Sequence, residues 1–200
     1  MLGDTEVTLT QRTPYPWDGA VGITVGLNQA KAFTLSLRIP GWCGHAKLSV
    51  NSEAIDLGVV TRRGYARIAR EWQPGDAVQL DLELAVQRLY ANPNVRQNAG
   101  RVALRRGPLM YCLEGTDNPA PLNSIMFPRD RVFEAKWEEG LLGGVVTLGA
   151  QARADESEDW GGELYRMAPP RSRDVAVRAV PYFAWDNREP GEMLVWLREG

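Results

Sequence analysis

Apolar residues recur at every second position along several short segments, and this period limits the fold more than any other feature. Successive side chains of a β-strand point to opposite faces, so a period of two predicts strands that are buried on one side. The pattern is clearest at residues 21–27, 33–39 and 78–84. It predicts further short strands at residues 6–11, 47–51, 65–69, 102–106, 109–114, 131–137, 145–152, 175–180 and 194–197.

Turn-forming residues separate these segments, and no long run shows the i, i+3, i+4, i+7 spacing of an amphipathic helix. Many short strands divided by Gly and Pro are typical of antiparallel sheets that pack face to face. The sequence therefore predicts an all-β fold with little helix, built as two consecutive antiparallel β-sandwich domains.

A polar stretch at residues 91–98 interrupts the strand rhythm and marks the expected domain boundary. We expect a first sandwich at residues 1–98 and a second at 99–200. Residues 154–162 hold four carboxylates within a short span and predict a flexible loop.

The charge balance excludes some classes of partner. The 23 Lys and Arg against 25 Asp and Glu give a net charge of −2, which argues against a nucleic-acid-binding surface.

Gly or Thr interrupts each apolar run, so no membrane span is expected. The first residues lack the basic and apolar regions of a signal peptide, which predicts a cytoplasmic location unless the true N-terminus lies upstream. With a single histidine, His45, a His-based triad or multi-histidine metal site is excluded.

Several separated motifs, in the same order, resemble glycoside hydrolase family 127, the β-L-arabinofuranosidase family. The resemblance rests on YPWDG at 15–19, RIPGWC at 38–43, VN at 50–51, GY at 64–65, EWQPGD at 71–76, GPLMYCLE at 107–114 and VPYFAWDNR at 180–188. It covers nearly the whole chain and corresponds to the β-sandwich regions that follow the catalytic barrel.

The resemblance implies that the chemistry lies outside this chain. In the family, an (α/α)6 barrel holds a cysteine nucleophile, a zinc ion bound by cysteines and a glutamate, and a glutamate acid/base. This sequence has neither the tandem cysteine pair nor the Glu-x-Cys pattern of that barrel. No catalytic position of the family maps onto a residue here, and we expect no cofactor or metal in this chain.

Several residues with reactive side chains are explained better by structural roles than by catalysis. Cys112 lies inside an apolar strand and Cys43 lies two residues from His45, and burial statistics favour packing for both thiols. The sequence leaves open whether the two cysteines form a disulfide. Glu114 and Asp117 could form a glycosidase acid pair, but a strand end followed by an Asx-type turn explains them better. The acidic loop at 155–159 lacks the ligand spacing of a calcium loop and favours a solvated face.

Seven tryptophans offer flat faces on which a sugar ring could stack. Trp17, Trp42 and Trp160 lie in predicted turns or loops and are the candidates for carbohydrate binding or domain docking. The other four lie in or beside strands, where packing is favoured: Trp72, Trp137, Trp185 and Trp196.

We therefore expect a non-catalytic accessory region that packs against the catalytic barrel of a β-L-arabinofuranosidase-like hydrolase and supports it. The alternative is a carbohydrate-binding module that uses the loop tryptophans. A third reading is an interaction surface, left bare without the barrel, that exposes an apolar patch including Trp42.

Overall fold

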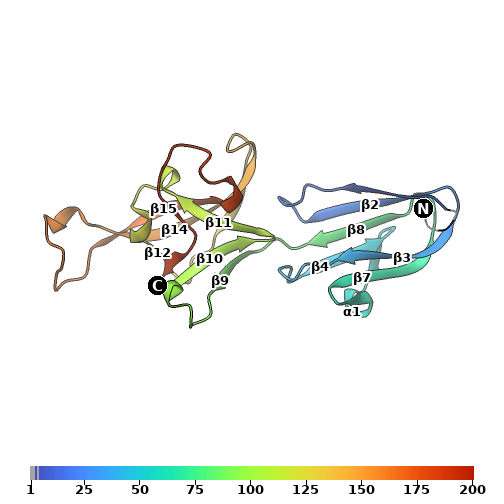
Figure 1. Cartoon of the computed structure of the whole chain (residues 1–200), viewed down its shortest axis with the longest axis horizontal. Coiled ribbons are helices and arrows are strands. Elements are labelled where there is room, and N and C mark those ends of the chain that lie inside the picture. The colour runs from blue at the N-terminus through green and yellow to red at the C-terminus, as the bar shows by residue number, and fades with distance from the viewer. Residues whose placement is uncertain (1–2, 4) are drawn as a thin grey trace. The chain divides into compact units, whose positions relative to one another are not determined.

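The computed structural model describes residue 3 and residues 5–200, apart from the side chain of Asp159. The chain divides into two compact units between Ala85 and Val86. The regular secondary structure of both units is mainly β-strand, with one short α-helix and a few 3-10 turns in the described part, which confirms the all-β prediction (Figure 1). None of the helices in this described part combines the length and apolar composition that crossing a bilayer requires.

The first unit is a sandwich of two antiparallel sheets. The larger sheet has the strand order β1-β2-β8-β4-β5, and the smaller has the order β3-β7-β6 (Figure 1). The elements are β1 (Val7–Arg12), β2 (Ala20–Leu27), β3 (Lys31–Arg38), β4 (Ala46–Val50), β5 (Glu53–Ile55), α1 (Leu57–Val60), β6 (Thr61–Arg62), β7 (Tyr65–Trp72) and β8 (Ala77–Leu82).

The alternating residues of both sheets meet in one core, as the period of two predicts. Ile23 and Val25 of β2 face inward from the larger sheet, and Leu35 and Leu37 of β3 face inward from the smaller. Trp72 is fully buried between them, and its indole N–H donates to a backbone carbonyl oxygen at 3.1 Å. That bond satisfies the one polar atom that the large side chain brings into the core.

Helix α1 was not predicted, because four residues are too short to show a helical period. Its first turn is capped by Asp56, whose carboxylate accepts the backbone N–H of Gly58 at 2.8 Å.

The second unit is built from one sheet of nine strands. They are β9 (Val86–Tyr90), β10 (Arg101–Arg106), β11 (Leu109–Glu114), β12 (Ile125–Phe127), β13 (Glu134–Glu138), β14 (Val145–Asp155), β15 (Ser172–Pro181), β16 (Met193–Leu194) and β17 (Leu197–Glu199). Five short 3-10 turns connect them, η1 (Arg96–Asn98), η2 (Gly115–Asp117), η3 (Leu122–Ser124), η4 (Glu158–Trp160) and η5 (Tyr182–Ala184).

This sheet closes on itself, so the second unit differs from the expected pair of facing sheets. Strand β10 pairs with β11 through Leu104–Arg106 and with β17 through Arg101 and Val102. The pairings β11-β15-β14-β12-β17 complete a barrel-like ring of six strands. All pairings in the ring are antiparallel except β12 with β17. Alternation along single strands cannot reveal this closure, because it depends on which distant strands pair.

The boundary between the units lies before β9, whereas the sequence placed it after residue 98. Strand β9 pairs with β10 along its whole length, from Val86 opposite Arg106 to Tyr90 opposite Val102. The polar stretch at 91–98 is therefore a connection inside the second unit. The polar residues Gln87 and Arg88 within β9 hide its strand pattern.

Candidate functional site

Trp17 and Trp42 lie in two neighbouring turns of the first unit, and both are half-buried. Trp42 packs against the core of that unit, and its ring stacks on Tyr15, with 6.4 Å between the ring centroids. Tyr15 belongs to the same turn as Trp17, so the stacking brings the two turns together. Part of the Trp42 ring surface is thus occupied by its own unit.

Trp160 belongs to the second unit, in the connection between β14 and β15. The guanidinium carbon of Arg166 lies 4.8 Å from the centroid of its ring, a cation–π geometry. Arg166 also donates to the carboxylate of Glu163 at 2.8 Å, and the backbone N–H of Glu163 donates to the carbonyl oxygen of Trp160 at 2.9 Å. The three candidate tryptophans are thus divided between two units.

Both cysteines are free thiols, so the disulfide that the sequence left open is not formed. Cys112 is fully buried in β11, and burial raises the pKa of its thiol to about 12. Cys43 is half-buried, and burial also raises the pKa of its thiol. Its sulfur donates to the carbonyl oxygen of His45 at 3.1 Å, while the His45 residue itself is exposed. Neither thiol has the lowered pKa of an activated nucleophile.

Glu114 and Asp117 do come together in space, but arginines hold both carboxylates. Arg188 donates from Nη1 to Asp117 Oδ1 at 2.9 Å and from Nη2 to Asp117 Oδ2 at 2.6 Å. The same guanidinium group also pairs with Glu114. Arg178 pairs with Asp117 from the other side and with Glu138 at 3.1 Å. The residues form a network that joins η2 to β15 and to the segment after η5.

The electrostatics of this network oppose acid catalysis by Asp117. Burial tends to raise the pKa of the Asp117 carboxyl, but hydrogen bonds from Arg188 and Arg178 outweigh it and hold that pKa below its usual range. The hydrogen bonds that Arg188 donates to Asp117 and Glu114 raise the pKa of its guanidinium group. A glycosidase acid needs the opposite change, a raised carboxyl pKa. The turn interpretation of the sequence agrees with the observed η2 turn.

The acidic loop is partly neutralised by arginines. Asp155 accepts from Arg198 at 2.9 Å, and Glu156 lies 3.7 Å from Arg173. The side chain of Asp159 is outside the described part. Within the residues that the structure describes, no group of three or more His, Cys, Asp or Glu side chains could hold a metal ion.

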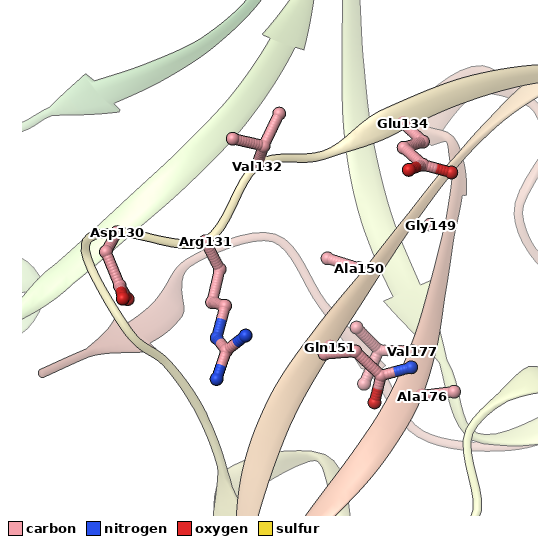
Figure 2. Close-up of a pocket in the computed structure, with 9 residues that line it drawn as sticks. All are labelled: Asp130, Arg131, Val132, Glu134, Gly149, Ala150, Gln151, Ala176 and Val177. Atoms are coloured by element: carbon pink, nitrogen blue, oxygen red, sulfur yellow. The ribbon is translucent and has the colours of Figure 1, made fainter.

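Sequence reasoning missed a groove on the second unit, with a volume of about 470 Å³ (Figure 2). Figure 2 shows Asp130 and Arg131 on a loop opposite Gln151 of β14, with Glu134 beside Gly149. The groove lies at a gap in strand pairing. On the edge of β14 that faces away from β15, β13 pairs with residues 145–149 and β12 pairs with residues 153–154. Within the described part of the chain, residues 150–152 have no partner strand on this edge.

A charged residue from a distant strand fixes the loop that forms one wall of this groove. Arg88 of β9 donates from Nη2 to the carbonyl oxygens of Pro128 and Arg131, each at 2.8 Å. Its Nη1 donates to Glu199 at 2.6 Å. Burial tends to raise the pKa of the Glu199 carboxyl, but hydrogen bonds from Arg88 and Tyr90 and the nearby arginine charges outweigh it and lower that pKa. Arg88 therefore holds the loop that carries Asp130 and Arg131 in place, and this loop faces the small residues Gly149 and Ala150 across the groove.

The groove side chains present both donors and acceptors. The carboxylates of Asp130 and Glu134 can only accept hydrogen bonds, Arg131 can only donate them, and Gln151 can do both. Gly149 and Ala150 leave space at the floor. Such a set suits a neutral ligand with several hydroxyl groups. No pattern in the sequence indicates it, because the four polar residues lie on two segments that are separated along the chain.

Comparisons with known proteins agree with the division of the chain. Residues 1–84 match the family model of the β-L-arabinofuranosidase GH127 middle domain, and residues 86–198 match that of the glycoside hydrolase family 127 C-terminal domain. These limits fall at the boundary between the two compact units.

Among curated proteins, the chain is similar to a non-reducing end β-L-arabinofuranosidase of Bifidobacterium longum subsp. longum. The two are 37% identical over an alignment that is 204 residues long with its gaps and covers 96% of this chain and 30% of that protein. The crystal structure of a GH127 β-L-arabinofuranosidase from Geobacillus stearothermophilus T6 is 47% identical, with a TM-score of 0.95, over 98% of this chain and 31% of that one. A further GH127 β-arabinofuranosidase structure is 30% identical, with a TM-score of 0.86, over 98% and 32%. The chain thus spans about 30% of the length of these relatives.

Proposed function

The chain belongs to glycoside hydrolase family 127, and we propose that it forms the non-catalytic part of a β-L-arabinofuranosidase-like hydrolase. In this proposal the two units pack against an (α/α)6 catalytic barrel of the same protein and support it. The barrel would supply the nucleophile, the zinc ion and the acid/base, and would hydrolyse terminal arabinofuranosides.

The observation that carries the proposal is the match of the whole chain to two adjoining domains of the family. The models of the middle and C-terminal domains match residues 1–84 and 86–198, while the matched relatives are about three times as long. The reactive side chains considered above have structural roles: they are buried or held in ion pairs. Cys112 is a buried thiol with a pKa of about 12, and Asp117 is held as an ion pair by Arg188.

A chimera tests this role. In this chimera, the region of the Geobacillus enzyme that matches the present chain, 31% of its length, is replaced by the present chain. We expect the chimera to hydrolyse an aryl β-L-arabinofuranoside and the enzyme without that part to be inactive or to unfold at a lower temperature. The 200-residue chain alone should show no hydrolysis. Turnover by the chain alone that Cys43→Ala or Glu114→Ala abolishes would overturn the proposal.

Glycan binding is a second candidate, because the groove in Figure 2 offers a set of groups suited to hydroxyls. None of the loop tryptophans that the sequence suggested lines it. Titration calorimetry with arabinose-containing oligosaccharides tests it, and we expect Ala150→Arg, which fills the floor, to abolish the heat of binding. The control is Thr24→Arg, which fills a second groove, of about 490 Å³, on the first unit. A heat signal that persists in Ala150→Arg would exclude the groove as its source.

A further inference from the structure

The long connection between β14 and β15, residues 156–171, exposes three large apolar side chains close together. Leu164 is 82% exposed, Tyr165 is 90% exposed and Met167 is fully exposed. Figure 1 shows this connection, in orange, extending away from the strands of its unit. We call these three residues the apolar tip. Apolar side chains that gather at one place on a surface often mark a site of interaction with another surface.

The apolar tip contributes nothing to the core of its own unit. The core cluster of the second unit contains no residue of 156–171. The base of the connection is nevertheless ordered by local contacts, the cation–π contact of Arg166 with Trp160 and the ion pair of Arg166 with Glu163. Pro169 and Pro170 restrict the backbone on the other side of the tip. These restraints reduce the entropy that the tip would lose when it binds another surface.

We propose that the apolar tip docks onto the remaining part of the same polypeptide. The proposal rests on the proposed function and names the surface through which the second unit would hold the catalytic part. The apolar patch therefore lies at Leu164, Tyr165 and Met167, whereas the sequence suggested that it would include Trp42.

The size of the tip favours a segment of the same chain over a separate partner. Three side chains of this kind offer on the order of 500 Å². A stable interface between separate proteins buries about 800 Å² on each side, so a second copy or another protein would be held weakly by the tip alone. A covalently linked segment meets the tip in an intramolecular contact, for which a smaller apolar area suffices than for two separate proteins. The matched relatives hold about 70% of their length outside the region that this chain covers, which provides such a segment.

The test compares one triple variant in two proteins. Leu164→Ser, Tyr165→Ser and Met167→Ser are combined in the 200-residue chain and in the Geobacillus chimera. In the chain alone we expect a melting temperature within about 1 °C of the parent, because exposed residues contribute little to stability. In the chimera we expect a fall of at least about 3 °C and faster hydrogen exchange in residues 156–171.

The matched control is Val59→Ser with Val132→Ser. These side chains are also exposed, at 66% and 79%, but lie outside the tip, and neither protein should change its melting temperature. An active chimera that the triple variant leaves unchanged would overturn the inference alone, whereas a chimera inactive at every temperature would overturn the proposed function as well. A dimer of the 200-residue chain in sedimentation that the triple variant dissociates would assign the tip to a second copy and also overturn the inference.

Discussion

Arg188 forms two parallel hydrogen bonds with Asp117, which precedes it by 71 residues in the chain. Nη1 lies 2.9 Å from Oδ1, and Nη2 lies 2.6 Å from Oδ2. This fork geometry is the strongest form of a carboxylate–guanidinium pair. Asp117 is nearly buried, with a side-chain exposure of 2%. The pair therefore locks the η2 turn to the segment that follows η5.

Arg188→Ala should destabilise the chain by about 3 kcal/mol, because it leaves Asp117 and Glu114 buried with less compensation. Arg178 still faces Asp117 in the variant, which limits the loss. Urea unfolding followed by circular dichroism measures the change. The matched control is Arg173→Ala, which removes a half-exposed pair with Glu156 and should change stability by less than about 1 kcal/mol. Equal effects of the two substitutions would contradict the structural role of Arg188.

Stability should fall in acid because the pKa of Asp117 and that of Glu199 are lowered in the folded state. A carboxyl with a lowered folded pKa contributes its full stabilisation above the unfolded value, about 4 for Asp and Glu. Below that value the unfolded chain binds the proton first, so the contribution is lost as the pH falls toward the folded pKa. We expect a flat free energy of unfolding between about pH 7 and 5.

Asp117→Asn tests whether Asp117 causes this loss of stability at low pH, which we call the acid limb. The variant should be less stable at neutral pH, and its free energy of unfolding should depend less on pH below about 4. Urea unfolding at a series of pH values gives both quantities. An acid limb of unchanged steepness would show that other carboxyls produce it.

The two thiols should differ in reactivity toward a disulfide reagent. A pKa of about 12 leaves roughly one Cys112 thiol in 10⁴ ionised at pH 8, and the side chain is fully buried. In the native chain we expect slow reaction of half-buried Cys43 alone, and reaction of Cys112 only after unfolding. Cys43→Ser should therefore leave no reactive thiol in the native protein. A second thiol that reacts before denaturant is added would contradict the burial of Cys112.

Gly19→Ala should disrupt the first unit, because a Cβ atom at Gly19 would lie 1.8 Å from the carbonyl oxygen of Leu82. The two backbones are also joined by a hydrogen bond from Leu82 N–H to Gly19 oxygen at 3.0 Å, so neither can move freely. We expect a loss of at least about 2 kcal/mol. Gly41→Ala is the matched control, since no atom lies within 4 Å of its Cβ position, and should stay within about 0.5 kcal/mol. Thermal unfolding compares the two.

The strands of the first unit could be predicted because their signal is local. The alternation of Ile23 with Val25 and of Leu35 with Leu37 agrees with their burial on one face of each sheet. The same local signal fails where polar residues stand inside a strand, as Arg88 does in β9. It also fails for α1, since four residues cannot show a period.

The site could be predicted only in part for a related reason. The sequence indicated that Glu114 and Asp117 form a turn and that Cys112 packs in a strand, and the structure agrees. It offered no sign that Arg188 would hold both carboxylates. The exposure of Leu164 and Tyr165 was equally hidden, because an apolar residue in a loop gives no indication of what covers it.

Local sequence patterns are enough to establish that this chain is all-β and which family it resembles, because strand periodicity and short motifs are properties of neighbouring residues. The tertiary structure alone decided how β10 closes the sheet of the second unit, where the two units divide, and that Arg88 anchors the wall of the groove. Those features join residues that lie far apart along the chain, and only the pairing of distant strands brings such residues within hydrogen-bonding distance.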